Sequence, residues 1–320
     1  MKKVILGRTG ISTTVAGLGC GGFSRIGLAK YGEAHAAGIA RKAYDLGIRF
    51  FDTATAYGTE AAVGKGLQGL PRDSYVISTK FPLSDGWREN YKQKFADTLN
   101  DSLRLLGTDY IDVYNIHGAP PPGKGYEDVR DLLIPELIKA RDAGKIRFPG
   151  VTEGFYTDTK HEMLNAALDD DFFDVIMIGY NILNQSAVNT IFPKTIKNNI
   201  GVLNMFAVRH ALSDPTHLKT IIGKILENGQ GGAGLTADEN ALDFLLAPGK
   251  DGIPVANSIM EAAYRFCAHT DGVHIVLTGT GSEKHLEDNI HSINSGALPV
   301  DIIEKLKQYF EKTDCVSGQI

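Results

Sequence analysis

The chain has 320 residues, of which 43% are hydrophobic and 22% are charged, and its formal net charge is −5. At ~150 residues per domain, this length allows one large domain or two ordinary ones. No apolar run approaches the ~18 residues that span a bilayer, and Lys and Arg form no cluster that would bind a phosphate backbone. We therefore expect a globular protein with no membrane span and no nucleic-acid partner.

The cysteines and the first residues indicate the cellular setting. Cys20, Cys267 and Cys315 are an odd number for a disulfide framework and too scattered for a cysteine-only metal site. They favour a reducing, cytoplasmic location. The opening MKKVILGRTG has the basic residues of a secretory leader, but Arg8 and Gly10 interrupt its apolar stretch too early. We expect this segment to be part of the fold.

Short apolar runs rich in strand-forming residues alternate along the chain with segments whose apolar residues have helical spacing. The predicted strands cover residues 13–21, 48–58, 75–81, 110–118, 146–154, 173–181, 200–208 and 274–281. The predicted helices cover residues 35–46, 60–67, 91–106, 129–143, 159–168, 187–198, 255–269 and 284–290. Nearly continuous apolar strands indicate a parallel sheet with both faces covered. This α/β alternation predicts a closed (β/α)₈ TIM barrel rather than an open, doubly wound sheet.

Three segments lie outside this repeat. The residues VILGRTGIS predict an N-terminal β-hairpin around Arg8, Thr9 and Gly10 that plugs the bottom of the barrel, and residues 299–312 predict an extra C-terminal helix. Residues 211–252 are the longest stretch off the pattern, and their glycine-rich part at 229–234 is either a lid over the substrate or a plain insertion. No linker divides the chain, so we expect a single domain over residues 1–320.

A glycine-rich motif, GLGCGG at residues 17–22, satisfies the G-x-G-x-x-G pattern of dinucleotide-binding folds. That fingerprint requires a helix to open at the third glycine. Residues 23–32 contain Gly27 and no convincing helix start. We therefore interpret the motif as a turn that leaves the first barrel strand.

Polar residues at the ends of successive strands predict an active site, because barrel enzymes collect their catalytic groups at the carboxyl ends of the strands. Asp52 ends the second predicted strand and Tyr57 follows it by five positions; Lys80 ends the third and His117 the fourth. Their side chains should converge on one mouth of the barrel. An Asp and a Lys in otherwise apolar strands also need a partner to be buried at tolerable cost.

These four residues make chemical sense as a proton-transfer unit. A free phenol has a pKa of ~10, and a nearby ammonium lowers this value because it favours the phenolate. Lys80 can supply that charge to Tyr57, and Asp52 can hold Lys80 in its charged form. His117 can hydrogen-bond the phenol or a substrate oxygen. Such a unit is suited to protonating a developing alkoxide.

The motifs FDTATAYG, ISTK and YNIHG resemble the catalytic motifs of the aldo-keto reductase family, and the likeness extends from LGRTG at residues 6–10 to GTGSEKHLEDN at residues 279–289. The resemblance implies a barrel that binds NADPH, or less often NADH, across its mouth and transfers a hydride to a carbonyl carbon. It also implies that Tyr57 is the general acid, that Lys80 and Asp52 tune it, and that His117 orients the carbonyl.

The predicted nicotinamide contacts depart from the family pattern. GVTEGF aligns with the family's Gly-Val-Ser-Asn, in which the hydroxyl and the amide hold the carboxamide, so Thr152 and Glu153 take these places. An ionised Glu can only accept hydrogen bonds, and Glu153 could therefore bind only the carboxamide NH₂. Met177 replaces the usual Gln, and Met205 or Phe206 falls under the nicotinamide ring.

Two further segments are candidates for the rest of the cofactor. Arg209 can reach the pyrophosphate or can be a surface residue. The motif GTGSEKHLEDN is a glycine turn followed by a helix N-terminus, where backbone N–H groups attract anions, and Ser282 is a candidate N-cap. The resemblance implies cofactor contacts at Gly279, Thr280, Gly281, Ser282, His285, Asp288 and Asn289.

This motif offers few residues that could bind the 2′-phosphate of NADPH. The family commonly places a Lys and an Arg where this chain has Gly279 and His285, and only Lys284 is nearby. Histidine is mostly uncharged at neutral pH. We therefore expect NADP(H) or NAD(H) as cofactor, with weak discrimination between them.

Two functions from different classes are consistent with this sequence. The leading one is a nicotinamide-dependent carbonyl reductase or alcohol dehydrogenase acting on a small carbonyl or alcohol. The other is a non-catalytic relative that keeps the cofactor as a ligand, motivated by Glu153, Met177 and Met205, although pure binding would not require the four catalytic residues. A metal hydrolase is a distant third, because His117 has no second His at ligand spacing.

The substrate and the oligomeric state are not readable from the sequence. Specificity should lie in the loops after the strands, chiefly residues 82–90, 119–127 and 211–252. Trp87, the single Trp, is either an apolar wall of the substrate pocket or an exposed loop residue.

Overall fold

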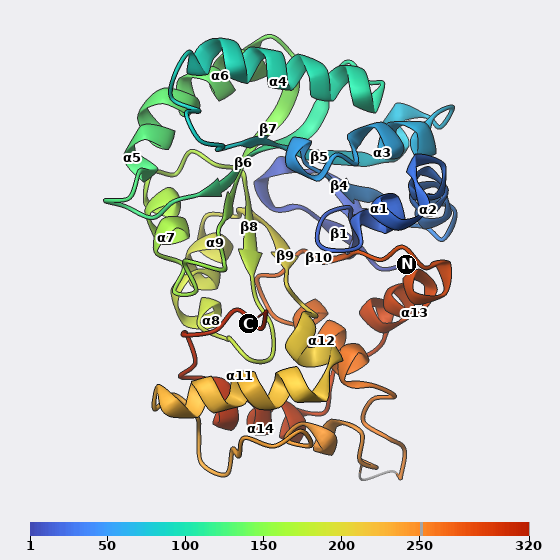
Figure 1. Ribbon diagram of the computed structural model, residues 1–320, viewed down its shortest axis with the longest axis vertical. Helices are drawn as coiled ribbons and strands as arrows, with labels where there is room; N and C mark the ends of the chain where they lie inside the picture. Colours follow the sequence, from blue (N-terminus) through green and yellow to red (C-terminus); the bar gives the residue numbers. More distant parts are fainter. Residues whose placement is uncertain (250–251, 320) are drawn as a thin grey trace.

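The computed structural model describes residues 1–249 and 252–319. Its centre is a closed barrel in which every neighbouring pair of strands is parallel, with the strand order β10-β3-β4-β5-β6-β7-β8-β9 (Figure 1). The bounds are β3 (Ala16–Gly19), β4 (Phe50–Asp52), β5 (Val76–Pro82), β6 (Ile111–Ala119), β7 (Ile146–Glu153), β8 (Val175–Gly179), β9 (Gly201–Met205) and β10 (Ile275–Thr278). The predicted (β/α)₈ TIM barrel is confirmed.

Helices surround the barrel strands (Figure 1). Their bounds are α1 (Leu28–Tyr31), α2 (Glu33–Asp45), α3 (Glu60–Leu67), α4 (Tyr91–Leu106), α5 (Tyr126–Asp128), α6 (Ile134–Asp142), α7 (Glu162–Asp169), α8 (Ala187–Thr190), α9 (Phe192–Lys197), α10 (His210–Ser213), α11 (Pro215–Glu227), α12 (Ile259–Ala268), α13 (Glu283–Asn294) and α14 (Val300–Phe310). The amphipathic segments therefore fold as the 3.6-residue periodicity predicts. The predicted C-terminal helix corresponds to α14.

The N-terminal hairpin closes the lower end of the barrel, as predicted. Strand β1 (Lys3–Ile5) pairs antiparallel with β2 (Ser12–Thr14). Leu6 and Ile11, on the connection between them, pack into the apolar cluster that fills the barrel interior. The predicted first strand at 13–21 is in fact divided, because its first residues belong to this hairpin and only residues from Ala16 onward join the barrel.

The segment after β9 is more ordered than a loop. It contains α10, α11 and a 3-10 turn at Asp243–Leu245, while two residues of the predicted stretch 211–252, residues 250 and 251, lie outside the described part of the chain. The glycine-rich part at 229–234 packs against α14. The Gly232 N–H donates to the Tyr309 carbonyl at 2.9 Å, and a Cβ at Gly232 would collide with the Gln308 carbonyl. These glycines allow two segments to approach closely, and they do not cover the barrel mouth.

Candidate active site

A cavity of about 1010 Å³ opens at the carboxyl ends of the barrel strands. This volume lies at the upper end of the ~300–1,000 Å³ that small-molecule and cofactor sites occupy. Asp52, Tyr57 and His117 line it, together with residues that follow β3, β7, β9 and β10. The strand ends therefore converge as the barrel geometry requires.

Asp52 and Lys80 form a buried ion pair at the floor of this cavity. Lys80 Nζ donates to Asp52 Oδ1 and Oδ2 at 2.8 and 2.7 Å and to the Thr53 carbonyl at 2.6 Å. Lys80 is fully buried and Asp52 is 3% exposed. Burial acts to lower the pKa of Lys80, but the Asp52 carboxylate and the Tyr57 phenol outweigh it, and the net pKa is raised. The ammonium therefore stays charged beneath the phenol.

Two residues that the sequence analysis missed hold this pair in place. Ser78 Oγ donates to Asp52 Oδ1 at 2.8 Å, and Asn115 Nδ2 donates to Ser78 Oγ at 3.0 Å. Both residues are fully buried. Each lies two positions before a predicted catalytic residue, so side-chain alternation puts Ser78 on the face of Lys80 and Asn115 on that of His117. This alternation was the sequence signal that could have identified Ser78 and Asn115.

Tyr57 and His117 meet above the ion pair. Tyr57 ends the 3-10 turn Thr55–Tyr57, and its hydroxyl lies 3.3 Å from His117 Nε2, within hydrogen-bond distance. Lys80 Nζ lies 4.9 Å from the centroid of the phenol ring. The structure thus brings together all four predicted catalytic residues.

The electrostatics of these two groups follow from their burial. Burial raises the pKa of Tyr57 above its ordinary value, and the Lys80 ammonium opposes this only in part. Lys80 therefore acts in the expected direction without producing the net lowering that we expected. Burial, assisted by Lys80, lowers the pKa of His117 to about 3, so its imidazole is neutral at physiological pH.

The glycine-rich motif at 17–22 makes room for the phenol. A Cβ at Gly21 would lie 2.7 Å from two atoms of the Tyr57 ring. No helix begins at Gly22, since the chain continues through turns to α1. The interpretation as a turn rather than a dinucleotide fingerprint agrees with this geometry.

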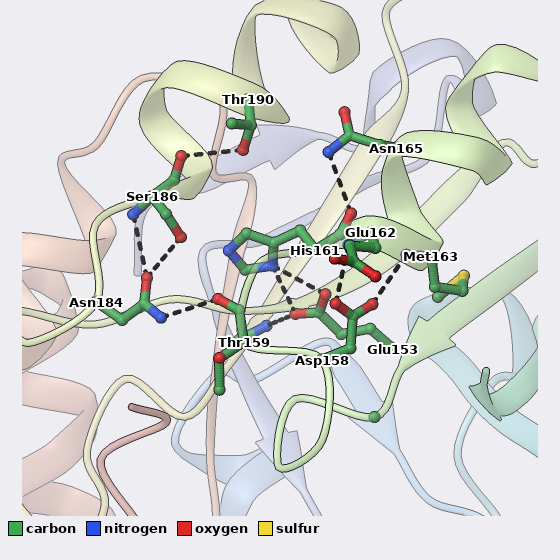
Figure 2. A network of polar contacts seen from close by, with 12 residues as sticks. Glu153, Asp158, Thr159, His161, Glu162, Met163, Asn165, Asn184, Ser186 and Thr190 are labelled. Carbon is green, nitrogen blue, oxygen red and sulfur yellow. Dashed lines mark hydrogen bonds and ion pairs between the residues drawn. The ribbon is translucent and has the colours of Figure 1, made fainter. Parts of the chain in front are cut away.

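Thr152 and Glu153, at the end of β7, point to different surroundings. Both residues line the cavity, and Thr152 Oγ1 accepts the Gly118 N–H at 2.7 Å, which leaves the Thr152 hydroxyl proton available to a ligand. The Glu153 carboxylate instead accepts from His161 Nδ1 at 2.9 and 3.1 Å and from the Gly179 N–H at 2.7 Å (Figure 2). Its side chain is 0% exposed. These partners already occupy the Glu153 carboxylate, so the geometry does not favour the expected contact between Glu153 and the carboxamide.

The residues after β9 supply the cavity with an unpaired cation. Met177, Met205 and Phe206 line the wall, and the Arg209 guanidinium lies 3.7 Å from the centroid of the Phe206 ring. Phe206 has a φ of +69°, a strained value for a bulky residue. Burial lowers the pKa of Arg209, and no carboxylate among the described residues opposes it. Within the described part of the chain, Arg209 thus has no carboxylate partner, and its guanidinium is suited to an anionic ligand group.

The glycine turn after β10 contributes fewer residues to the cavity lining than expected. Gly279, Thr280, His285, Asp288 and Asn289 line the cavity, whereas Gly281 and Ser282 are not part of its lining.

Gly281 and Ser282 have structural roles instead. A Cβ at Gly281 would lie 2.7 Å from the Gly27 Cα, and Ser282 Oγ caps α13 by accepting the His285 N–H at 3.3 Å. Lys284 pairs with Asp288 at 2.8 Å on the surface, outside the cavity lining.

Trp87 does not form a wall of the cavity. It is 5% exposed, belongs to the large buried hydrophobic cluster and is not among the residues that line the cavity. Neither alternative for this residue, a pocket wall or an exposed loop Trp, was right. An indole in a loop contributes a large apolar area, and here that area is used for packing.

The described residues offer no group of three or more His, Cys, Asp and Glu side chains that could hold a metal ion. Within the same residues, none of the helices is both long enough and apolar enough to cross a membrane.

Comparison with known proteins gives the following sequence similarities. The chain matches the model of the Aldo/keto reductase family over residues 17–311. The L-galactose dehydrogenase of Arabidopsis thaliana is 27% identical over 204 residues, which are 62% of this chain and 63% of that protein. An aldo-keto reductase of Mycobacterium avium (strain 104) is 35% identical over 130 residues, 40% of this chain and 42% of that protein. The chain therefore matches less than two thirds of the length of these relatives.

Solved structures resemble the fold over nearly the whole chain. A holo form of an aldo-keto reductase from Bacillus halodurans has a TM-score of 0.70 at 24% identity, with 96% of each chain covered. An aldo-keto reductase from Klebsiella pneumoniae in complex with NADPH has a TM-score of 0.66 at 20% identity, covering 96% of this chain and 94% of that one. At these identities the likeness shows a shared barrel fold.

Proposed function

Because the chain belongs to the Aldo/keto reductase family, we propose that it transfers a hydride between NAD(P)H and the carbonyl carbon of an aldehyde, ketone or sugar, with Tyr57 as the general acid. The observation that carries this proposal is the assembled proton-transfer unit: Tyr57 lies over the buried Lys80–Asp52 pair and within hydrogen-bond distance of His117. A protein that only binds the cofactor would have no use for this unit, which weighs against the non-catalytic alternative.

The residues of the cavity are compatible with a nicotinamide dinucleotide. The cavity volume of about 1010 Å³ is large enough for an extended cofactor. The Arg209 guanidinium, which has no carboxylate partner among the described residues, can hold a pyrophosphate. Thr152 can donate to the carboxamide, with Met205 and Phe206 beside the ring. Thr280, Asp288 and Asn289 can contact the adenosine. The bound cofactor supplies the hydride.

The protein's own residues then handle the proton. In the reducing direction Tyr57 donates its hydroxyl proton to the carbonyl oxygen as negative charge develops there. Lys80 stabilises the phenolate that remains, and Asp52 keeps Lys80 charged and in position. The neutral imidazole of His117 can donate a hydrogen bond to the same oxygen and orient it.

The residue at position 279 supports a proposal about the choice between NADH and NADPH. Gly279 has no side chain to hold a 2′-phosphate, and a Cβ there would collide with the Gly19 carbonyl, so this position cannot carry a cation. We therefore expect NADH and NADPH to bind with similar affinity.

The similarity to L-galactose dehydrogenase supports a sugar among the carbonyl or alcohol substrates. A cytoplasmic location stays our proposal from the cysteine content.

The replacement Tyr57→Phe tests the proposal. It removes only the phenolic oxygen and its proton, so the affinity for the cofactor should be kept while carbonyl reduction falls by ~10²- to 10⁴-fold, the usual contribution of a general acid. The measurements are cofactor titration and turnover with a panel of aldehydes, ketones and sugars. A rate within tenfold of the parent protein would contradict the role of Tyr57.

A further inference from the structure

A turn behind the cavity wall is tied to the segment that follows β9. Asn181 lies just after β8, is fully buried and is not among the residues that line the cavity. Its Oδ1 accepts the N–H groups of Leu183 and Asn184 at 2.9 and 3.1 Å, which fixes the turn. Its Nδ2 donates to the Phe206 carbonyl at 3.3 Å and to the Ser317 carbonyl at 3.1 Å. The Asn181 amide therefore joins the turn after β8 to the residues after β9.

The backbone conformation of Phe206 depends on this hydrogen bond. Its φ of +69° is a left-handed conformation that a bulky residue keeps only where its surroundings impose it. In the described part of the chain, Asn181 Nδ2 is the one donor to the Phe206 carbonyl. Phe206 is 7% exposed, so without this donor its carbonyl would be left unsatisfied in a nearly dry site, which is costly. Loss of the Asn181 amide would therefore favour rotation of this residue out of the left-handed region.

The Phe206 ring in turn supports Arg209. The guanidinium lies 3.7 Å from the centroid of this ring and 6.0 Å from the centroid of the Tyr156 ring. Among the described residues, no side-chain hydrogen bond holds the guanidinium. A guanidinium is attracted to the face of an aromatic ring, so these two rings determine where it lies in the cavity that all three residues line.

We propose that Asn181 is a positioning residue for Arg209. By holding Phe206 in its left-handed conformation, Asn181 keeps the aromatic ring against the guanidinium, which is then oriented before an anionic ligand group arrives. The inference rests on the proposed function, in which Arg209 holds the pyrophosphate of the cofactor. Such preorganisation raises affinity, because the Arg209 side chain has less freedom to lose on binding. Asn181 acts only through Phe206 and Arg209, since it does not line the cavity.

The replacement Asn181→Ser tests this role. The Ser hydroxyl can still accept the Leu183 N–H within the turn, but it has no amide that would reach the Phe206 carbonyl. Binding of ADP-ribose, which contains the pyrophosphate and lacks the nicotinamide, is measured by calorimetry. We expect its dissociation constant to rise by about fivefold, equivalent to ~1 kcal/mol. In an Arg209→Met background the same replacement should raise the constant by less than twofold, because the guanidinium that Asn181 positions is absent.

Asn184→Ser is the matched control. Asn184 is also fully buried in this turn, and its Nδ2 donates to the Thr159 carbonyl at 3.0 Å (Figure 2). The same Nδ2 donates to the Val316 carbonyl at 2.9 Å. The control therefore loses as many amide hydrogen bonds as Asn181→Ser does, but none of them is to Phe206. Its dissociation constant for ADP-ribose should stay within twofold of that of the parent protein, whereas a purely structural role of Asn181 would give both variants the same loss.

A second variant, Phe206→Leu, keeps the backbone hydrogen bond and removes the ring against Arg209. It should raise the dissociation constant for ADP-ribose by about threefold or more, and it decides the question if Asn181→Ser does not unfold cooperatively. A change below twofold in the variant that is used, or an equal loss with and without Arg209, overturns the positioning role and leaves the proposed hydride transfer standing. Failure of the unaltered protein to bind ADP-ribose, NADH and NADPH overturns both.

Discussion

The close approach of Gly21 to the Tyr57 phenol, the proposed general acid, gives a sharp test of the site. In Gly21→Ala the new Cβ would lie 2.7 Å from two atoms of the Tyr57 ring, whereas ordinary van der Waals contact begins at 3.4 Å. The phenol must therefore move by about 0.7 Å, the difference of these values. Its hydroxyl lies 3.3 Å from His117 Nε2, so a movement of this size would change the geometry of that contact. Since a misplacement of ~1 Å can cost ~10²-fold in rate, we expect turnover to fall by about 30- to 100-fold.

The assay separates displacement of the phenol from other damage. Turnover is measured for Gly21→Ala alone and in the Tyr57→Phe background, where the same replacement should cost less than threefold because the proton donor is already absent. Gly38→Ala is the control, since a Cβ there meets no atom within 4 Å and the site is in α2. It should leave turnover unchanged and add ~0.5–1 kcal/mol of stability. Turnover of Gly21→Ala within threefold of the parent protein would refute the reasoning.

Two further predictions concern the proton and the cofactor. Lys80→Met should reduce turnover and move the alkaline limb of the pH–rate profile for carbonyl reduction upward, because the pKa of Tyr57 rises when its neighbouring cation is lost; an unchanged profile contradicts the tuning role. NADH and NADPH should bind the unaltered protein with dissociation constants within ~tenfold of each other. His285→Arg should tighten NADPH binding by ~10-fold or more, because the guanidinium can form a charge-assisted hydrogen bond with the 2′-phosphate, while NADH binding should stay within twofold of the parent protein. A preference for NADPH above a hundredfold before any substitution would show that other groups already hold the 2′-phosphate.

The sequence by itself determined the barrel and the positions of the residues that we propose to be catalytic. Strand and helix periods are local properties, and a parallel barrel necessarily brings its strand ends together, so Asp52, Lys80 and His117 could be located without knowledge of any contact. Tyr57 was found because its turn follows a strand directly. The hairpin and α14 were likewise evident from local pattern.

Only the tertiary structure decided where side chains near these positions point. The Glu153 carboxylate is held by His161, the residue before α7, and by the Gly179 N–H at the end of β8. Trp87 is buried because a core surface lies under its loop, and Gly232 packs on α14, far along the chain. Each outcome depends on a partner supplied by another segment of the fold, and that partner sets the free energy of burying or pairing the side chain.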